Sequence, residues 1–163
     1  MISDSKITAL LLSFVLMSEA NVLFFTEDVN FTFQHAVVVK QWLYYIANHE
    51  NDAINHANVI FCSNDYILDV NKSYLSHDYY TDIITFPLMD VGTPIEADIF
   101  ISIDTVRSNA ADRSISFEHE LFRVIVHGFL HMLGYGDKSE SEAKVMRQKE
   151  DFYLDYFFAE IYC

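Results

Sequence analysis

A short segment of the sequence combines three residues that bind divalent metals. His127 and His131 are four positions apart, so on a helix their imidazoles project from one face, one turn apart. Gly134 favours the end of that helix and a turn that returns Asp137 towards the two rings. An HxxxH pair alone also occurs on partly buried helices, but two imidazoles, a carboxylate and an open fourth position are typical of catalytic zinc. We predict one zinc ion bound by His127, His131 and Asp137.

The spacing HxxxHxxGxxD is that of the metzincin proteases, but the residue after the first histidine argues against their activity. Metzincins carry a glutamate there, which acts as the general base. Gly128 occupies this position and cannot take a proton from water. The pattern therefore favours a metal hydrolase whose base lies elsewhere, or one in which the metal itself forms hydroxide. The sequence assigns no catalytic residue beyond the metal ligands.

The surrounding sequence predicts alternating strands and helices that position this segment. Runs rich in β-branched and aromatic residues predict four strands, at residues 22–26, 57–62, 82–86 and 98–103. Helical spacing of apolar residues and capping signals predict helices at residues 32–50, 63–74, 117–133 and 139–160. The chain therefore begins with a βαβ unit, and the two histidines lie in the third predicted helix.

Length and composition indicate one folded, acidic domain. The 163 residues are 52% hydrophobic and 15% aromatic with only 4 glycines and 2 prolines, which excludes low-complexity classes and global disorder. Ten Lys and Arg against 24 Asp and Glu give a net charge of −14, the wrong sign for a broad nucleic-acid-binding face. Any RNA contact must be local, metal-assisted or supplied by a partner. Cys62 and Cys163 form no CxxC pair, and we interpret both as reduced thiols.

Residues 1–20 form an apolar N-terminal extension, which we separate from the domain at residues 21–163. The run 7–17 follows a lysine and precedes Ser-Glu-Ala, an outline shared with signal peptides. It is too short to span a bilayer, and Asp4 offsets the only lysine before it. A packed helix, or an extension upstream of Met17 as an alternative start, are the other interpretations. We expect no stable membrane association and a cytoplasmic location.

Three ordered blocks carry a resemblance to a known family. Residues 127–137 read HGFLHMLGYGD, residues 71–87 read NKSYLSHDYYTDIITFP, and residues 97–102 read ADIFIS. They resemble the signatures HGxLHLxGYDH, NxxYRxKDxPTDVLSFP and GDIxIS of the YbeY family, the metal-dependent endoribonucleases that mature bacterial ribosomal RNA. The resemblance spans about residues 22–155.

The resemblance implies an α+β fold of zincin-like type, with a small mixed four-stranded sheet and the metal-binding helix beneath a cleft. It implies zinc-dependent endonucleolytic hydrolysis of single-stranded RNA during ribosomal RNA maturation and ribosome assembly. Zinc would polarise a phosphoryl oxygen and lower the pKa of water towards about 7. The implied partners are ribosomal RNA and the small ribosomal subunit or its assembly proteins.

Three residues depart from the family blocks. Asp137 replaces a histidine, which keeps a metal ligand but adds a negative charge. Leu75 replaces an arginine, which removes a cation that would grip a phosphate, and His77 replaces a lysine. A basic rim would have to come from scattered candidates: Lys72, Arg107, Arg113 and Arg123.

Several other side chains have both a structural and a functional interpretation. Glu120 and Arg123 either support an imidazole or a phosphate or pair with each other at i,i+3, which we favour. We assign Asp78 and Asp82 to turn capping rather than catalysis, and the charged run 140–150 to a solvated helix face. Aromatic residues near the C-terminus are assigned to the core rather than to base stacking: Tyr153, Tyr156, Phe157 and Phe158. Histidines without a partner pattern are expected at the surface: His35, His49, His56 and His119.

Three functional hypotheses follow. The leading one is a zinc-dependent endoribonuclease that acts on ribosomal RNA. An alternative is a non-catalytic ribosome-assembly factor with a structural metal, which the lost cation at Leu75 and the acidic composition favour. A secreted metalloprotease is compatible with the apolar N-terminus but is opposed by Gly128.

Overall fold

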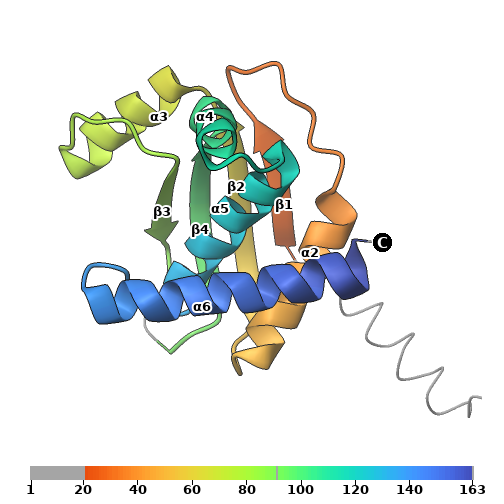
Figure 1. Ribbon diagram of the computed structural model, residues 1–163. Coiled ribbons are helices and arrows are strands. Elements are labelled where there is room, and N and C mark those ends of the chain that lie inside the picture. The colour runs from red at the N-terminus through yellow and green to blue at the C-terminus, as the bar shows by residue number, and fades with distance from the viewer. Residues whose placement is uncertain (1–20, 91, 163) are drawn as a thin grey trace, which may run out of the picture.

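The computed structural model describes residues 21–90 and 92–162, which form a mixed sheet with helices on both faces (Figure 1). The strands lie in the order β1 (Asn21–Thr26), β2 (Ile54–Cys62), β4 (Ile95–Ser102) and β3 (Ile83–Pro87). The first three are parallel, and β3 runs antiparallel to β4 at one edge. This confirms the predicted α+β fold with a small mixed sheet of four strands. The apolar extension at residues 1–20 and Cys163 lie outside the described residues.

In the described part of the chain, five α-helices connect and cover the strands: α2 (Ala36–His49), α3 (Asn64–Val70), α4 (Ile103–Arg113), α5 (Phe117–Met132) and α6 (Glu140–Tyr156). Short π-helical turns continue two of them, η1 (Asn71–Leu75) after α3 and η2 (Phe157–Ile161) after α6. All the predicted helices and strands are present, with ends shifted by a few residues. Within the described ranges, none of the helices combines the length and apolar character needed to cross a membrane.

Serine residues begin four of these helices. The hydroxyl oxygens of Ser63, Ser102, Ser116 and Ser139 accept hydrogen bonds from backbone N–H groups in the first turns of α3, α4, α5 and α6. Ser139 and Glu142 form the predicted capping box, in which each side chain bonds the other residue's backbone N–H. Sequence analysis did not predict α4, because its cap, Ser102, lies inside the run interpreted as a strand.

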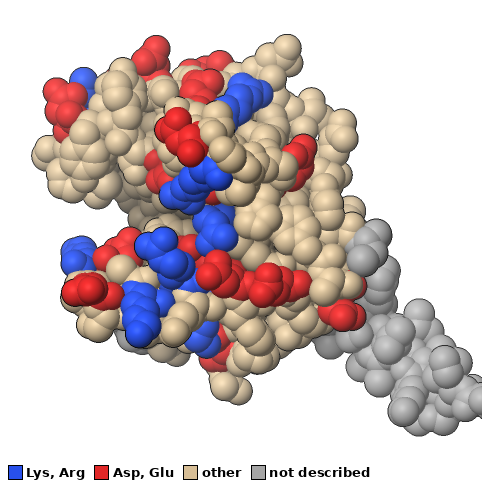
Figure 2. Space-filling model, viewed as in Figure 1, with Lys and Arg blue, Asp and Glu red and all other residues tan. Residues whose placement is uncertain are grey.

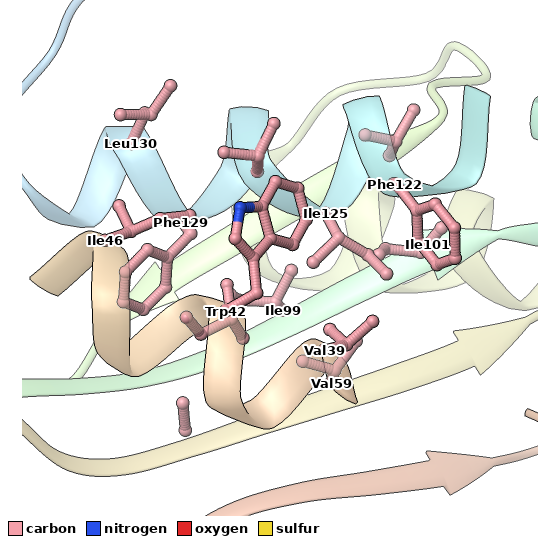
Figure 3. Packing of buried hydrophobic residues seen from close by; sticks show 14 of the residues in the cluster. Val39, Trp42, Ile46, Val59, Ile99, Ile101, Phe122, Ile125, Phe129 and Leu130 are labelled. Atoms are coloured by element: carbon pink, nitrogen blue, oxygen red, sulfur yellow. The ribbon is translucent and has the colours of Figure 1, made fainter. Parts of the chain in front are cut away.

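The main core lies between one face of the sheet and the helices α2 and α5 (Figure 3). Trp42 of α2 is fully buried against α5, and its Nε1 donates to the backbone oxygen of Tyr153 in α6, 3.1 Å away. Tyr153 and Phe157 are fully buried, as the core assignment of the aromatic cluster predicted. These contacts join α2, α5 and α6 in one apolar core.

A smaller apolar cluster covers the other face of the sheet beneath α3. It consists of Cys62, Ile67 and Ile84, with half-buried residues around them. Cys62 is a free thiol, as expected, and burial raises its pKa to about 12. This thiol is therefore protonated at neutral pH.

Gly128 allows α5 to lie directly against the sheet. A Cβ at this position would clash with Ile83 Cδ1 of β3 and would lie 3.1 Å from Thr85 Cγ2 and 3.4 Å from Ile99 Cγ2. The residue after the first histidine therefore directs its Cβ position at side chains of the sheet. The glycine is required by this close approach rather than by its backbone angles.

We expect Gly128→Ala to lower the free energy of unfolding by about 1–3 kcal/mol through overpacking. Ile83→Val removes the methyl group nearest to the new Cβ, so the double variant should be more stable than the sum of the two single effects by about 1 kcal/mol. Urea unfolding of all four proteins measures this coupling. Strict additivity would show that α5 does not approach β3 as closely as described.

Glu50, just after α2, joins that helix to α6 and to the segment after α5. Its carboxylate accepts hydrogen bonds from Lys149 Nζ and Tyr135 Oη, each 2.7 Å away, and from Tyr153 Oη. Burial alone would raise the pKa of Glu50, but these three donors outweigh it and lower the pKa to about 2. The ionised carboxylate therefore stabilises the fold.

Glu50→Gln should lower the free energy of unfolding by about 2 kcal/mol at pH 7, because charge-assisted hydrogen bonds are lost. Since the pKa is depressed in the folded state, the stabilisation is present above about pH 4.5 and is lost as the pH falls towards 2. The difference between wild type and variant should therefore shrink over this window in thermal melts. Glu160→Gln, an exposed carboxylate on η2, is the control and should stay within about 0.5 kcal/mol of wild type. A pH-independent difference for Glu50→Gln would contradict this prediction.

Candidate metal centre

The C-terminal half of α5 and the turn after it bring the three predicted ligands together. The Nε2 atoms of His127 and His131 lie 3.0 Å apart on the same face of the helix. Gly134 ends the helix with φ of +90°, a conformation that favours glycine, and the chain turns back. Asp137 Oδ2 then lies 3.6 Å from His127 Nε2 and 3.5 Å from His131 Nε2. The sequence prediction that these side chains converge matches the geometry.

The hydrogen bonds of the two imidazoles leave their Nε2 atoms suited to bind a cation. His131 Nδ1 lies 2.8 Å from the backbone oxygen of Tyr135, which can only accept, so Nδ1 carries the proton. His127 Nδ1 lies 2.7 Å from Glu150 Oε1, also an acceptor when ionised. In the neutral rings both Nε2 lone pairs therefore face each other and the Asp137 carboxylate. Three acceptor atoms within 4.8 Å of one another repel unless a positive charge lies among them, and the donor set fits a divalent metal.

Glu150 orients His127, and sequence analysis missed this role. The interpretation of residues 140–150 as a solvated face is wrong for Glu150, whose exposed fraction is only 8%. Burial alone would raise the pKa of Glu150, but its hydrogen bond to His127 and the charge of Arg123 lower it. Burial alone would lower the pKa of His127, and Glu150 outweighs this and raises it. The carboxylate therefore favours positive charge on or beside this ring, a property shared by carboxylates behind metal-bound histidines.

Arg123 holds the Glu150 carboxylate in place. Its Nη1 lies 3.0 Å from Glu150 Oε2 and 3.1 Å from Asp151 Oδ1. The favoured interpretation, an ion pair between Arg123 and Glu120, is wrong, because Glu120 instead pairs with Arg113 at 3.0 Å. The alternative that Arg123 supports an imidazole matches the structure, acting through Glu150.

Tyr135 orients the imidazole of His131, as Glu150 orients that of His127. Its backbone oxygen accepts a hydrogen bond from His131 Nδ1, while its hydroxyl donates a hydrogen bond to Glu50. The two imidazoles are thus anchored to different elements, His127 to α6 and His131 to the turn tied to α2. This arrangement fixes both rings before any ion binds.

A pocket of about 630 Å³ is lined by two of the three predicted ligands, His127 of α5 and Asp137. Asp82 and further residues of α4, α5 and α6 complete its lining. Figure 2 shows basic side chains over and just above α6, beside a hollow between the α3–η1 segment and the start of α6. Of the four cations considered for a basic rim, Arg113 and Arg123 line this pocket, whereas Lys72 and Arg107 do not.

Two residues of the pocket differ from their sequence interpretation. Asp82 was assigned to turn capping, but its Oδ2 accepts a hydrogen bond from Asn109 Nδ2 in α4, 3.3 Å away, and it lines the pocket. His119 was expected at the surface, yet it is half-buried, and its ring stacks on Phe158 with centroids 5.2 Å apart. Asp78 remains exposed and pairs with Lys72 at 2.8 Å.

Comparisons with known proteins agree with this geometry. A family model described as Endoribonuclease YbeY matches residues 21–157, which include the whole sheet and the three predicted metal ligands. The chain belongs to the YbeY family. A YbeY relative named Endoribonuclease YbeY, from Cytophaga hutchinsonii, is 46% identical over 135 residues, covering 83% of this chain and 94% of that protein. Relatives of the same name from Amoebophilus asiaticus and Flavobacterium psychrophilum are 38% and 41% identical, each covered over 94% of its length, and they match 85% and 82% of this chain.

A solved structure shares the YbeY fold described above. The solution structure of TM1509 from Thermotoga maritima superposes with a TM-score of 0.62 and 29% sequence identity, covering 85% of this chain and 90% of that one. Leu75, at the position of the arginine in the YbeY block, is 41% exposed on η1 and places no charge there. Among the residues that line the pocket, positive charge is supplied by arginines.

We expect Glu150→Gln to weaken zinc binding about 10- to 100-fold, because the ring of His127 loses its anionic partner. Titration of metal-free protein against a competing chelator measures the affinity. Asp151→Asn is the matched control. It also removes one negative charge from a carboxylate partner of Arg123, but Asp151 forms no hydrogen bond with His127. Equal losses in the two variants would show that only general electrostatics matters at this position.

Proposed function

We propose that this chain is a zinc-dependent endoribonuclease that cleaves single-stranded ribosomal RNA during ribosome maturation. The observation that carries the proposal is the convergence of three metal-binding atoms beside an arginine-lined pocket, in a chain of the YbeY family. The endoribonuclease names of the relatives support the reaction class.

His127, His131 and Asp137 would hold one zinc ion, with a fourth coordination position open towards the pocket. When bound, such an ion polarises a phosphoryl oxygen and lowers the pKa of water towards about 7. The protein's own contribution is positional. Glu150 and the backbone of Tyr135 fix the two rings, and the pocket admits a phosphodiester beside them.

The proposed substrate, ribosomal RNA, also implies the partners and the location of the protein. Ribosomal RNA, with the small ribosomal subunit or its assembly proteins, would be the partner, and the cytoplasm the site of action. We propose residues 21–163 as the unit that carries this activity, which is supported by a family match that begins at residue 21.

Purified protein loaded with zinc should cleave an unstructured, fluorescently labelled RNA, and chelation or His131→Ala should reduce the rate by about 100-fold or more. His56→Ala, a histidine of β2 outside the pocket lining, is the matched control and should retain wild-type activity. Metal analysis of wild type and Asp137→Ala tests the third ligand directly. A cleavage rate that is unchanged by both chelation and His131→Ala would exclude the metal mechanism. No cleavage by a folded, zinc-loaded protein would favour the non-catalytic assembly factor.

A further inference from the structure

The pocket concentrates most of the chain's arginines. The sequence contains four arginines in a chain of net charge −14, and three of them line the pocket beside the metal ligands: Arg113, Arg123 and Arg147. They come from three different helices, α4, α5 and α6. The pocket is therefore the place where an acidic protein gathers guanidinium groups.

Two of these arginines are already paired with carboxylates. Arg113 bonds the buried carboxylate of Glu120, and Arg123 bonds Glu150 and Asp151. Arg147 is different, because it is exposed on α6 and forms no salt bridge with any residue in the described ranges 21–90 and 92–162. Its guanidinium keeps all of its donors available to a ligand.

The balance of charge in the pocket gives Arg147 its importance. Five carboxylates and three arginines line the pocket, and three of those carboxylates are paired with Arg113 or Arg123. The other two are Asp82 and Asp137, whose charges a divalent ion would neutralise. Arg147 would then bring the net charge of the lining to zero, and it is the lining arginine that no carboxylate of the described residues occupies.

The position of Arg147 on α6 places it close to the metal ligands. It precedes Glu150 by three residues, which is about 4.5 Å along the helix axis. Glu150 in turn bonds His127. Arg147, His127 and Asp137 line the same pocket, so a strand of RNA with one phosphate at the predicted metal site would lie near Arg147.

We propose that Arg147 binds a backbone phosphate of single-stranded RNA adjacent to the phosphate that is cleaved. The planar guanidinium would donate two parallel hydrogen bonds to non-bridging phosphate oxygens. This inference rests on the proposed function and names the residue that grips the substrate backbone. Contact with a phosphate positions the RNA without selecting its sequence.

The test measures binding of a short, fluorescein-labelled oligouridine to zinc-loaded protein by anisotropy, at several salt concentrations. We expect Arg147→Gln to raise the Kd about five- to tenfold and to reduce the slope of log Kd against log salt by about 0.7, the value for one phosphate contact on a single strand. In cleavage assays KM should rise while kcat stays within about twofold of wild type. Arg147→Lys should restore the salt slope, because it restores the charge.

Arg107→Gln is the matched control, since Arg107 is an exposed arginine on α4 that does not line the pocket. It should leave the Kd within about twofold of wild type and the salt slope unchanged. If both variants weaken binding equally, or neither does, while wild type cleaves RNA, the role of Arg147 is overturned and the proposed function stands. If wild type neither binds nor cleaves RNA, the proposed function itself is overturned.

Discussion

The geometry of the candidate metal centre depends on keeping three hydrogen-bond acceptor atoms close together. The Nε2 atoms of His127 and His131 and a carboxylate oxygen of Asp137 face a common point, where they repel unless a cation is present. The opposite edge of each imidazole ring is anchored, because each Nδ1 donates a hydrogen bond to an acceptor outside the three converging residues. α6 supplies one of these acceptors and the turn after α5 supplies the other. The preorganised rings can bind a metal without first losing conformational freedom.

The anchoring network also couples the candidate metal centre to the core. The backbone oxygen of Tyr135 accepts a hydrogen bond from His131 Nδ1, and its hydroxyl donates a hydrogen bond to Glu50, at the end of α2. Glu50 also bonds Tyr153 of α6, whose backbone oxygen accepts from Trp42 in the centre of the core. Displacement of α2 or α6 would therefore move the acceptors that fix the imidazoles. The positions of the two imidazoles therefore depend on the packing of the core.

Sequence reasoning succeeded where the determining interactions are local and failed where they are long-range. The spacing of His127, His131 and Asp137 around Gly134 fixes their convergence within eleven residues. Glu150 is 23 positions from His127 and lies among other charged residues, so no local pattern separates it from a solvated face. Arg123 has an acidic neighbour at i−3, but the tertiary fold gives it two carboxylates from α6 instead.

The contact between Gly128 and the sheet limits how this scaffold can change its chemistry. The position that carries the general base in metzincin proteases is here pressed against Ile83 and Thr85 of β3. A glutamate introduced there would be driven into packed side chains and would force α5 away from the strands. Peptidase activity of the metzincin type is thus not one substitution away from this fold. An evolutionary route between the two chemistries would first have to reset the distance between helix and sheet.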